Sequence, residues 1–279
     1  MGGQQGIPTV ILCGGLGTRL REETEYRPKP LVPIGDRPIL WHIMKSYARF
    51  GFSDFMLALG YKGEMIKDYF LNYDLLSSDF TLELGSKAIT RLTELSERDW
   101  RITFVDTGAS TMTGGRLRRL EPLLRQTGRF MLTYGDGLSD VDVPALLAFH
   151  ERSGCAVTVT GVRPVTRYGE LLIEGDHVRR FAEKPVSEGW VSGGYFVMTP
   201  RVFDYLAADE TFLEREPLER LAADGELSVY RHDGFWACMD TYRDMQNLNE
   251  QWTSGRAPWK QWADGEGTAS RPFRPKLAS

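Results

Sequence analysis

A short apolar run, Thr9 to Cys13, leads directly into a glycine-rich loop, and this junction constrains the fold more than any other segment of the chain. The loop reads Gly14-Gly15-Leu16-Gly17-Thr18-Arg19-Leu20. Glycines leave backbone N–H groups open to an anion, and the start of a helix adds partial positive charge. A buried strand that ends in such a loop is typical of α/β proteins that bind phosphate groups.

Two full positive charges accompany this loop. Arg19 lies inside it, and Lys29 follows between two prolines in Pro28-Lys29-Pro30. The combination suits a triphosphate better than a dinucleotide, because the dinucleotide fingerprint requires a third glycine where this chain has Leu20. The Walker A pattern fails as well, since no Gly-Lys-Ser/Thr follows the loop. A nicotinamide-dependent oxidoreductase is therefore disfavoured.

The overall charge and apolar content exclude several other classes of protein. The 279 residues carry a formal net charge of −4 with no block of like charges, which argues against a surface that binds nucleic acid. No apolar run approaches the roughly 20 residues of a membrane helix, and no signal sequence is visible, so we expect no membrane association and a cytoplasmic location. The cysteines Cys13, Cys155 and Cys238 lack the spacing of a zinc site, and we expect a structural role for them.

The first half of the chain alternates strand-like and helix-like stretches. The strand-like stretches are Thr9–Cys13, Asp54–Leu59, Arg101–Val105 and Phe130–Thr133, and the helical ones are Pro38–Phe50, Glu64–Asn72 and Arg116–Arg125. Phe80–Glu83 and Ala88–Thr93 are interpreted as a hairpin beyond the sheet. Alternation of this kind predicts an α/β fold with a doubly wound, mostly parallel, Rossmann-like sheet.

The second half predicts a smaller mixed sheet that covers a pocket. Its short strands are expected at Ala156–Val162, Leu171–Ile173, Val178–Phe181 and Val191–Met198, and its helices at Arg201–Ala207, Pro217–Ala223 and Tyr242–Trp252. We expect one domain over residues 1–264, with a nucleotide-binding half at about 9–150 and a second half at about 151–264. Residues 265–279 are polar and contain proline, so a disordered tail is predicted.

Two acids follow apolar runs and are candidate metal ligands. Asp136 lies between Gly135 and Gly137 at the end of a buried strand, where ligands collect in open α/β sheets, and carboxylates suit Mg²⁺. A simple turn aspartate is the alternative. Asp240 follows a second apolar run and precedes a helix, so an N-cap role competes with metal binding. Neither spacing nor periodicity proves that the two acids meet.

Two further motifs suggest contacts with a sugar phosphate. In Glu183-Lys184-Pro185, Lys184 is suited to hold a phosphate and Glu183 a sugar hydroxyl, whereas the alternative is an exposed turn with a weak ion pair. Gly193 and Gly194 lie inside a strand, which costs stability unless something approaches the backbone closely. Aromatic side chains such as Tyr195 and Trp236 offer an apolar face to a sugar ring, although aromatic residues are more often core.

Together these motifs resemble the sugar nucleotidyltransferases, and the resemblance runs from about residue 9 to residue 262. The glycine loop, Pro28-Lys29-Pro30, Gly135-Asp136-Gly137 and Glu183-Lys184-Pro185 occur in the family's order. Further segments narrow the resemblance to the glucose-1-phosphate cytidylyltransferase branch, and these are residues 38–45, 60–63, 111–117, 133–137, 239–241 and 258–260. Ala237-Cys238, Ser192 and Tyr195 depart from that branch's usual residues, and the departures concern the sugar side.

The resemblance implies a reaction in which CTP and α-D-glucose 1-phosphate give CDP-glucose and pyrophosphate. It assigns Mg²⁺ to Asp136 and Asp240, the β- and γ-phosphates to Arg19, and charge at the α-phosphate to Lys29. The nucleotide is also expected to contact Gly14, Gly15, Gly17, Thr18, Tyr134 and Gly135, with Arg116 on the cytosine side. The sugar phosphate is expected to contact Gly169, Glu183, Lys184, Gly193, Gly194, Tyr195 and Trp236.

Three questions stay open at the level of sequence. A nucleotidyltransferase of the same fold that uses dTTP or UTP is the nearest alternative, and a non-catalytic regulatory protein is a more distant one. A homo-oligomer is expected, with a hexamer favoured by the cytidylyl branch and a tetramer possible from the thymidylyl branch. The product would enter the synthesis of polysaccharides or of a secondary metabolite.

Overall fold

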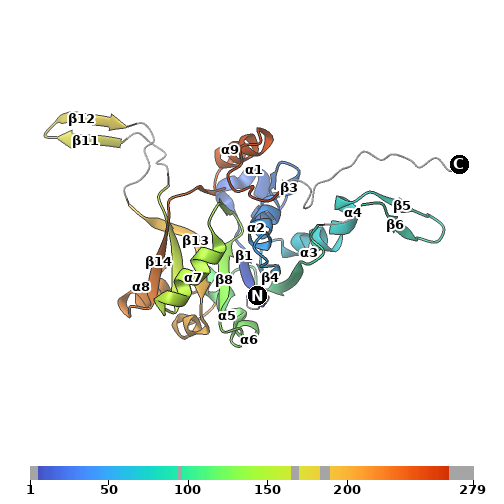
Figure 1. Cartoon of the computed structure of the whole chain (residues 1–279), viewed down its shortest axis with the longest axis horizontal. Coiled ribbons are helices and arrows are strands. Elements are labelled where there is room, and N and C mark those ends of the chain that lie inside the picture. Colours follow the sequence, from blue (N-terminus) through green and yellow to red (C-terminus); the bar gives the residue numbers. More distant parts are fainter. Residues whose placement is uncertain (1–5, 94–95, 165–169, 183–188, 264–279) are drawn as a thin grey trace.

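A single seven-stranded sheet runs through the molecule (Figure 1). The computed structural model describes residues 6–93, 96–164, 170–182 and 189–263. The strands lie in the order β14-β10-β13-β8-β1-β4-β7. Their bounds are Thr9–Cys13 (β1), Asp54–Leu59 (β4), Arg101–Asp106 (β7), Phe130–Tyr134 (β8), Val157–Val162 (β10), Val191–Met198 (β13) and Leu227–His232 (β14).

The pairing confirms the predicted mostly parallel α/β fold. β1 is parallel to β4 and β8, β4 to β7, and β10 to β14, whereas β13 is antiparallel to both β8 and β10. The mixed pairing expected of the second half is present. β10, β13 and β14 extend the first half's sheet, whereas the strands predicted at Leu171–Ile173 and Val178–Phe181 form a separate two-stranded ribbon. β14 escaped the sequence analysis because it is an edge strand with half-exposed side chains and therefore lacks an apolar run.

Helices and apolar side chains form a core on each face of the sheet. The helices are α2 (Ile39–Ala48), α3 (Gly63–Leu71), α4 (Tyr73–Ser77), α5 (Thr113–Arg119), α6 (Glu121–Leu124), α7 (Val143–Ser153), α8 (Glu216–Ala223) and α9 (Tyr242–Thr253). The helix predicted at Arg116–Arg125 begins at Thr113 and is divided at Leu120, where Pro122 lies near the start of α6. The helix predicted at Arg201–Ala207 is a 3₁₀ helix, η3, at Pro200–Tyr205.

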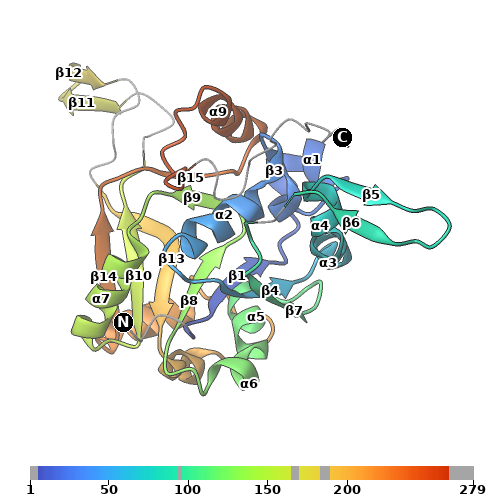
Figure 2. The same ribbon diagram turned by 45° about the vertical axis from the view of Figure 1, so that its right-hand side comes forward.

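Two ribbons extend away from the body of the molecule (Figures 1 and 2). One is the predicted hairpin, formed by β5 (Phe80–Leu82) and β6 (Ile89–Arg91), and the other pairs β11 (Glu170–Glu174) with β12 (His177–Ala182). Within the part of the chain that the structure describes, every helix is too short or too polar to span a membrane. The predicted tail at 265–279 lies outside the described residues.

Two small strand pairs lie outside the main sheet and join segments that are distant in the sequence to the site. β2 (Pro33–Ile34) pairs with β3 (Arg37–Pro38), and β9 (Gly137–Ser139) pairs with β15 (Trp236–Cys238). The Asn249 side chain of α9 accepts a hydrogen bond from Gly35 N at 2.8 Å and donates one to Pro33 O at 3.3 Å. The C-terminal helix is thereby fastened to the turn that follows Lys29 in the chain.

Candidate active site

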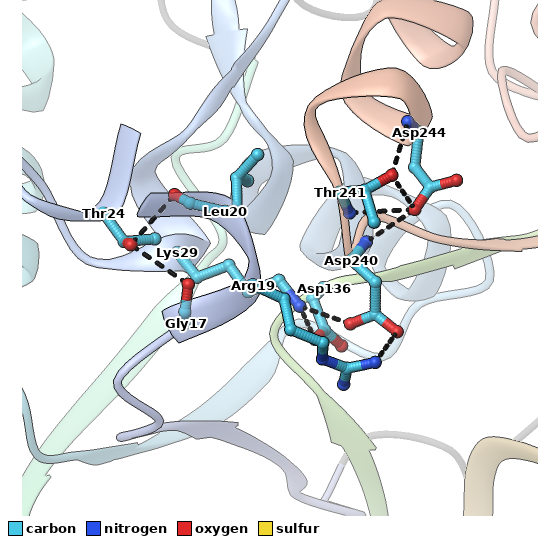
Figure 3. A network of polar contacts seen from close by, with 9 residues as sticks. All are labelled: Gly17, Arg19, Leu20, Thr24, Lys29, Asp136, Asp240, Thr241 and Asp244. Atoms are coloured by element: carbon cyan, nitrogen blue, oxygen red, sulfur yellow. Dashed lines mark hydrogen bonds and ion pairs between the residues drawn. The ribbon is translucent and has the colours of Figure 1, made fainter. Parts of the chain in front are cut away.

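The structure brings the two candidate metal ligands together. Asp136 immediately precedes β9 and Asp240 lies two residues after β15, and these strands pair with Gly137 opposite Cys238. The ammonium group of Lys29 donates to Asp136 at 2.6 Å and to Asp240 at 2.9 Å. Arg19 forms an ion pair with the second carboxylate oxygen of Asp240 at 2.8 Å (Figure 3). Four of the residues singled out from the sequence therefore form one network.

Electrostatics favour the charged forms of Lys29 and Asp240. Burial disfavours the Asp240 carboxylate, but hydrogen bonding and the charges of Lys29 and Arg19 outweigh it, so the pKa of Asp240 lies below its ordinary value. Burial also disfavours the Lys29 ammonium, yet Asp136 and Asp240 outweigh that effect and raise the pKa of Lys29. The arrangement is a compact set of opposite charges at neutral pH.

The start of α9 leaves the Asp240 side chain available for this network. Thr241 is the N-cap residue, and its hydroxyl accepts a hydrogen bond from Asp244 N in a capping box. The Asp244 carboxylate accepts from the backbone N–H groups of Asp240 and Thr241 at 3.2 and 2.8 Å (Figure 3). The alternative N-cap role of Asp240 is thus filled by Thr241, and the capping box fixes the backbone from which the Asp240 carboxylate extends.

The donor atoms fit a divalent cation. One ligand atom from each of Asp136, Cys238 and Asp240 lies within 4.8 Å of the others. Two carboxylates supply hard oxygen ligands, and the remaining positions around Mg²⁺ usually belong to water and substrate phosphates. Burial raises the pKa of the Cys238 thiol, so this side chain is neutral at the edge of the group. Cys238 therefore lies beside the two candidate metal ligands as a neutral, partly buried side chain, in line with the structural role predicted for it.

A pocket of about 300 Å³ opens beside these charges. It is lined by Leu12, Cys13, Gly14, Gly15, Gly17, Thr18, Arg19, Lys29, Pro30, Thr111, Met112, Thr113, Arg116, Tyr134, Gly135, Asp136 and Phe212. Every residue that the sequence analysis assigned to the nucleotide therefore lines the same pocket. The glycine loop continues into a 3₁₀ turn, η1 (Thr18–Leu20), and a four-residue helix, α1 (Arg21–Thr24), so the expected helix start is only one turn long.

The side chain of Arg116 packs against the glycine loop and supports it. Its side chain is buried, and a Cβ at Gly14 would lie 2.1 Å from its guanidinium carbon, which explains why the loop begins with glycine. The guanidinium donates to Gly14 O at 3.0 Å, to Leu59 O at 2.9 Å and to Gly108 O at 2.7 Å. Arg116 therefore joins the loop to the ends of β4 and β7 while it also lines the pocket, and its contact with cytosine stays a prediction.

The residues predicted on the sugar side are only partly described. Gly169, Glu183 and Lys184 lie outside the described residues, so their positions are not compared with the prediction. Tyr195 is 1% exposed, and its hydroxyl donates to Gly137 O at 3.1 Å, so it supports β9 from the core. Any contribution of Tyr195 to a sugar site therefore comes through the backbone that it holds.

Protein side chains lie close to the two glycines of β13, Gly193 and Gly194. A Cβ at Gly194, where φ is +77°, would lie 2.5 Å from the ring of Tyr134. The indole N–H of Trp236 donates to Gly193 O at 2.7 Å. The close approach inferred from these glycines is therefore made by protein side chains, and the Tyr134 hydroxyl donates in turn to Glu214.

Sequence analysis missed several residues of the pocket wall. Thr111, Met112 and Thr113 belong to a segment that it quoted, but only Arg116 was selected from it, because charge was the criterion. Phe212 lies in a loop between η3 and α8, and no sequence pattern marks it. Loop 208–215 meets the start of α5 only in the folded chain, through bonds such as Gly114 N to Thr211 O at 2.9 Å.

Comparison with known proteins agrees with this geometry. The Nucleotidyl transferase family model matches residues 8–241. The glucose-1-phosphate cytidylyltransferases of Salmonella typhi and Salmonella typhimurium are each 47% identical over 257 residues, which cover 92% of this chain and 100% of each relative.

A solved structure supports the fold alone. HddC from Yersinia pseudotuberculosis complexed with GMP-PN superposes with a TM-score of 0.65 and 23% identity, over 88% of this chain and 99% of that one. The chain therefore belongs to the nucleotidyl transferase family and, within it, to the group of the glucose-1-phosphate cytidylyltransferases.

Proposed function

We propose that this protein transfers a cytidylyl group from CTP to α-D-glucose 1-phosphate and releases pyrophosphate, with CDP-glucose as the product. The observation that carries the proposal is the bridge from Lys29 to both Asp136 and Asp240 beside a glycine-lined pocket. The choice of CTP and glucose 1-phosphate is supported by relatives of that name, which are 47% identical to nearly the whole chain.

The chemical difficulty of this reaction is repulsion between two anions. The sugar phosphate oxygen is already a nucleophile at neutral pH, so no general base is required, but it must approach the α-phosphorus of a tetra-anion. Catalysis then consists mainly of in-line positioning and neutralisation of charge. The bond from the α-phosphorus to the sugar phosphate oxygen forms as the bond to the leaving pyrophosphate breaks.

Each charged residue of the network has a role in this proposal. Arg19 and the N–H groups of Gly15 and Gly17 hold the β- and γ-phosphates, and Lys29 stabilises charge at the α-phosphate. Asp136 and Asp240 hold Mg²⁺, which when bound neutralises charge between the nucleotide and the incoming phosphate.

In this proposal, residues of the second half of the chain bind the sugar phosphate. Lys184 anchors its phosphate group, while Glu183, Gly169 and Gly194 line the glucose pocket. Arg116 remains the proposed contact on the cytosine side, at the floor of the same pocket.

Pyrophosphate release with five separate nucleotides tests the proposed reaction. The purified protein receives Mg²⁺, glucose 1-phosphate and either CTP, UTP, dTTP, ATP or GTP, and the nucleotide sugar is identified by mass. We expect strong release with CTP alone and CDP-glucose as the product. Omission of glucose 1-phosphate is the control, since hydrolysis of CTP by itself would also release pyrophosphate.

The other outcomes separate the alternatives. Release with dTTP or UTP in place of CTP would preserve the mechanism and overturn the assignment of the base. If no pyrophosphate is released with any of the five nucleotides, and none with other hexose 1-phosphates, the result would favour a non-catalytic regulatory protein. The intact set Arg19, Lys29, Asp136 and Asp240 argues against that alternative, because a protein without catalysis has no need of it.

We also propose that the chain forms a homo-oligomer. Both ribbons carry exposed apolar side chains, such as Leu82, Ile89, Val178 and Phe181, each at least 42% exposed. Exposed apolar surface of this kind is typical of interaction sites. Light scattering after gel filtration measures the mass directly; six copies are expected, four would fit the thymidylyl branch, and a monomer would refute the proposal.

A further inference from the structure

Phe212 is a large apolar side chain left partly exposed in the wall of the nucleotide pocket. It is 36% exposed, whereas its neighbour Leu213 is fully buried in the core. Exposed aromatic side chains in concave sites are frequent points of ligand contact. The position of Phe212 therefore calls for an explanation in terms of the ligand.

The backbone on both sides of Phe212 is fixed before any ligand binds. Gly114 N donates to Thr211 O at 2.9 Å, and Leu213 N donates to the Thr113 hydroxyl at 2.9 Å. The loop is thus fastened to the start of α5 at the residues directly before and after Phe212. A side chain on such a prearranged support loses little conformational entropy on binding.

One face of the Phe212 ring is already occupied. The guanidinium carbon of Arg215 lies 4.3 Å from the ring centroid, within the range of a cation–π interaction. Because the ring also lines the pocket, its remaining surface is the part that a ligand meets. A flat, uncharged partner matches that surface.

The pocket lining combines charged and apolar side chains, and a nucleoside triphosphate likewise combines charged phosphates with a flat base. Arg19, Lys29 and Asp136 form the charged group that suits phosphates and a metal ion. Met112 and Phe212 add apolar surface to the lining, which suits a heterocyclic base, and Arg116 adds a hydrogen-bond donor for the cytosine side. The glycine loop and Phe212 line the same pocket, so one nucleotide can contact both.

We propose that Phe212 stacks against the nucleobase of the bound nucleotide, an inference that deepens the proposed function and rests on it. Stacking on an aromatic ring tolerates every base, because each base has a π-face. Phe212 therefore supplies affinity for the base, while discrimination between cytosine and uracil falls to hydrogen-bonding groups. Its loss weakens the binding of CTP and UTP by the same factor.

Isothermal titration calorimetry with two ligands tests this assignment. The ligands are CTP and inorganic tripolyphosphate, which carries the phosphates without a base. For Phe212→Ala we expect the Kd of CTP to rise about tenfold, which corresponds to about 1.4 kcal/mol, and the Kd of tripolyphosphate to stay within about twofold. Phe212→Trp retains the affinity for CTP, and Leu123→Ala, which removes an exposed apolar side chain outside the pocket, is the matched control.

Two results would overturn the assignment. Equal affinity of Phe212→Ala and wild type for CTP would remove the ring from base binding. An equal loss of affinity for CTP and tripolyphosphate would show that the ring only supports the loop. Product formation by the wild type is measured separately, so that CTP binding without CDP-glucose would count against the proposed function and leave the stacking assignment standing.

Discussion

Lys29 donates to the same two carboxylates that a divalent cation would use, so the ammonium group and the metal ion compete for them. A nucleotide relieves this competition, because its phosphates offer Lys29 other acceptors. If the proposed roles hold, the binding of a metal ion and the binding of a nucleotide are coupled through one side chain.

The competition predicts an unusual effect of Lys29→Met. Because the variant removes a cation and leaves Asp136 and Asp240 in place, Mn²⁺ should bind about tenfold more tightly in the absence of nucleotide, which corresponds to about 1.4 kcal/mol. Electron paramagnetic resonance of a Mn²⁺ titration measures the affinity without turnover. Arg27→Met is the control, since Arg27 pairs with Glu23 outside the network. Weaker Mn²⁺ binding in Lys29→Met would mean that Lys29 holds the carboxylates together.

Replacement of either carboxylate tests its role in the reaction. We expect Asp136→Asn and Asp240→Asn to lower turnover by about 10²–10³-fold, because each removes a charge that acts in the transition state. Pyrophosphate release gives the rate, and circular dichroism verifies that the fold is retained. Turnover like that of the wild type in either variant would exclude that carboxylate from the mechanism.

At the scale of elements, the contact between α9 and the β2–β3 turn places Asp240 opposite Lys29. Gly35 in that turn has a φ of +66°, and a Cβ there would lie 2.2 Å from the indole ring of Trp252. A larger residue would therefore separate the helix from the turn.

Gly35→Ala measures the strength of this contact. We expect the free energy of unfolding to fall by about 2–4 kcal/mol, from backbone strain and overpacking together. Gly128→Ala is a matched control, because its φ is +69° and a methyl group there would meet no other described atom within 4 Å. Its cost should be about 1 kcal/mol. Urea denaturation of both variants gives the difference, and equal losses would show that Trp252 adds nothing.

The sequence predicted elements best where the physical signal was local. The central strands have continuous apolar runs and α2 is rich in apolar residues, because both sides of these elements are buried, and their prediction is confirmed. The pairing of β9 with β15 could not be predicted, since both strands are short and only their register brings Asp136 near Asp240. Phe212 was missed because its position also depends on contacts between distant segments. Hydrogen bonds between its neighbours in the chain and the start of α5 hold it in the pocket wall.

At the scale of the whole molecule, the first and last parts of the chain meet around one buried histidine. The His42 ring lies 4.5 Å from the ring of Trp252 and within 6.3 Å of those of Trp259 and Trp262, measured between centroids. Its Nε2–H donates to Ile34 O at 2.9 Å. Burial lowers the pKa of His42 to about 4 from an ordinary value of 6.5, so the folded protein holds this side chain neutral.

This histidine makes stability depend on pH. Between pH 6.5 and about 4, His42 is protonated in the unfolded chain and neutral in the folded chain. The contribution of His42 to stability is therefore fully present above pH 6.5 and is lost as the pH falls through this window. The loss from His42 amounts to about 3 kcal/mol at most. Urea denaturation at pH 7.5 and pH 4.5 measures it. His42→Asn should show a shallower dependence on pH, and an unchanged dependence would assign the effect to other groups.

The pairing of β9 with β15 also determines when the proposed site can be completed during protein synthesis. During translation, the glycine loop and Asp136 leave the ribosome with the first strands of the sheet. Domains generally fold from their N-terminal side as they emerge. Asp240 follows only near the end of translation. A chain that stops before residue 240 therefore lacks one of the two proposed metal ligands, and we expect it to be inactive.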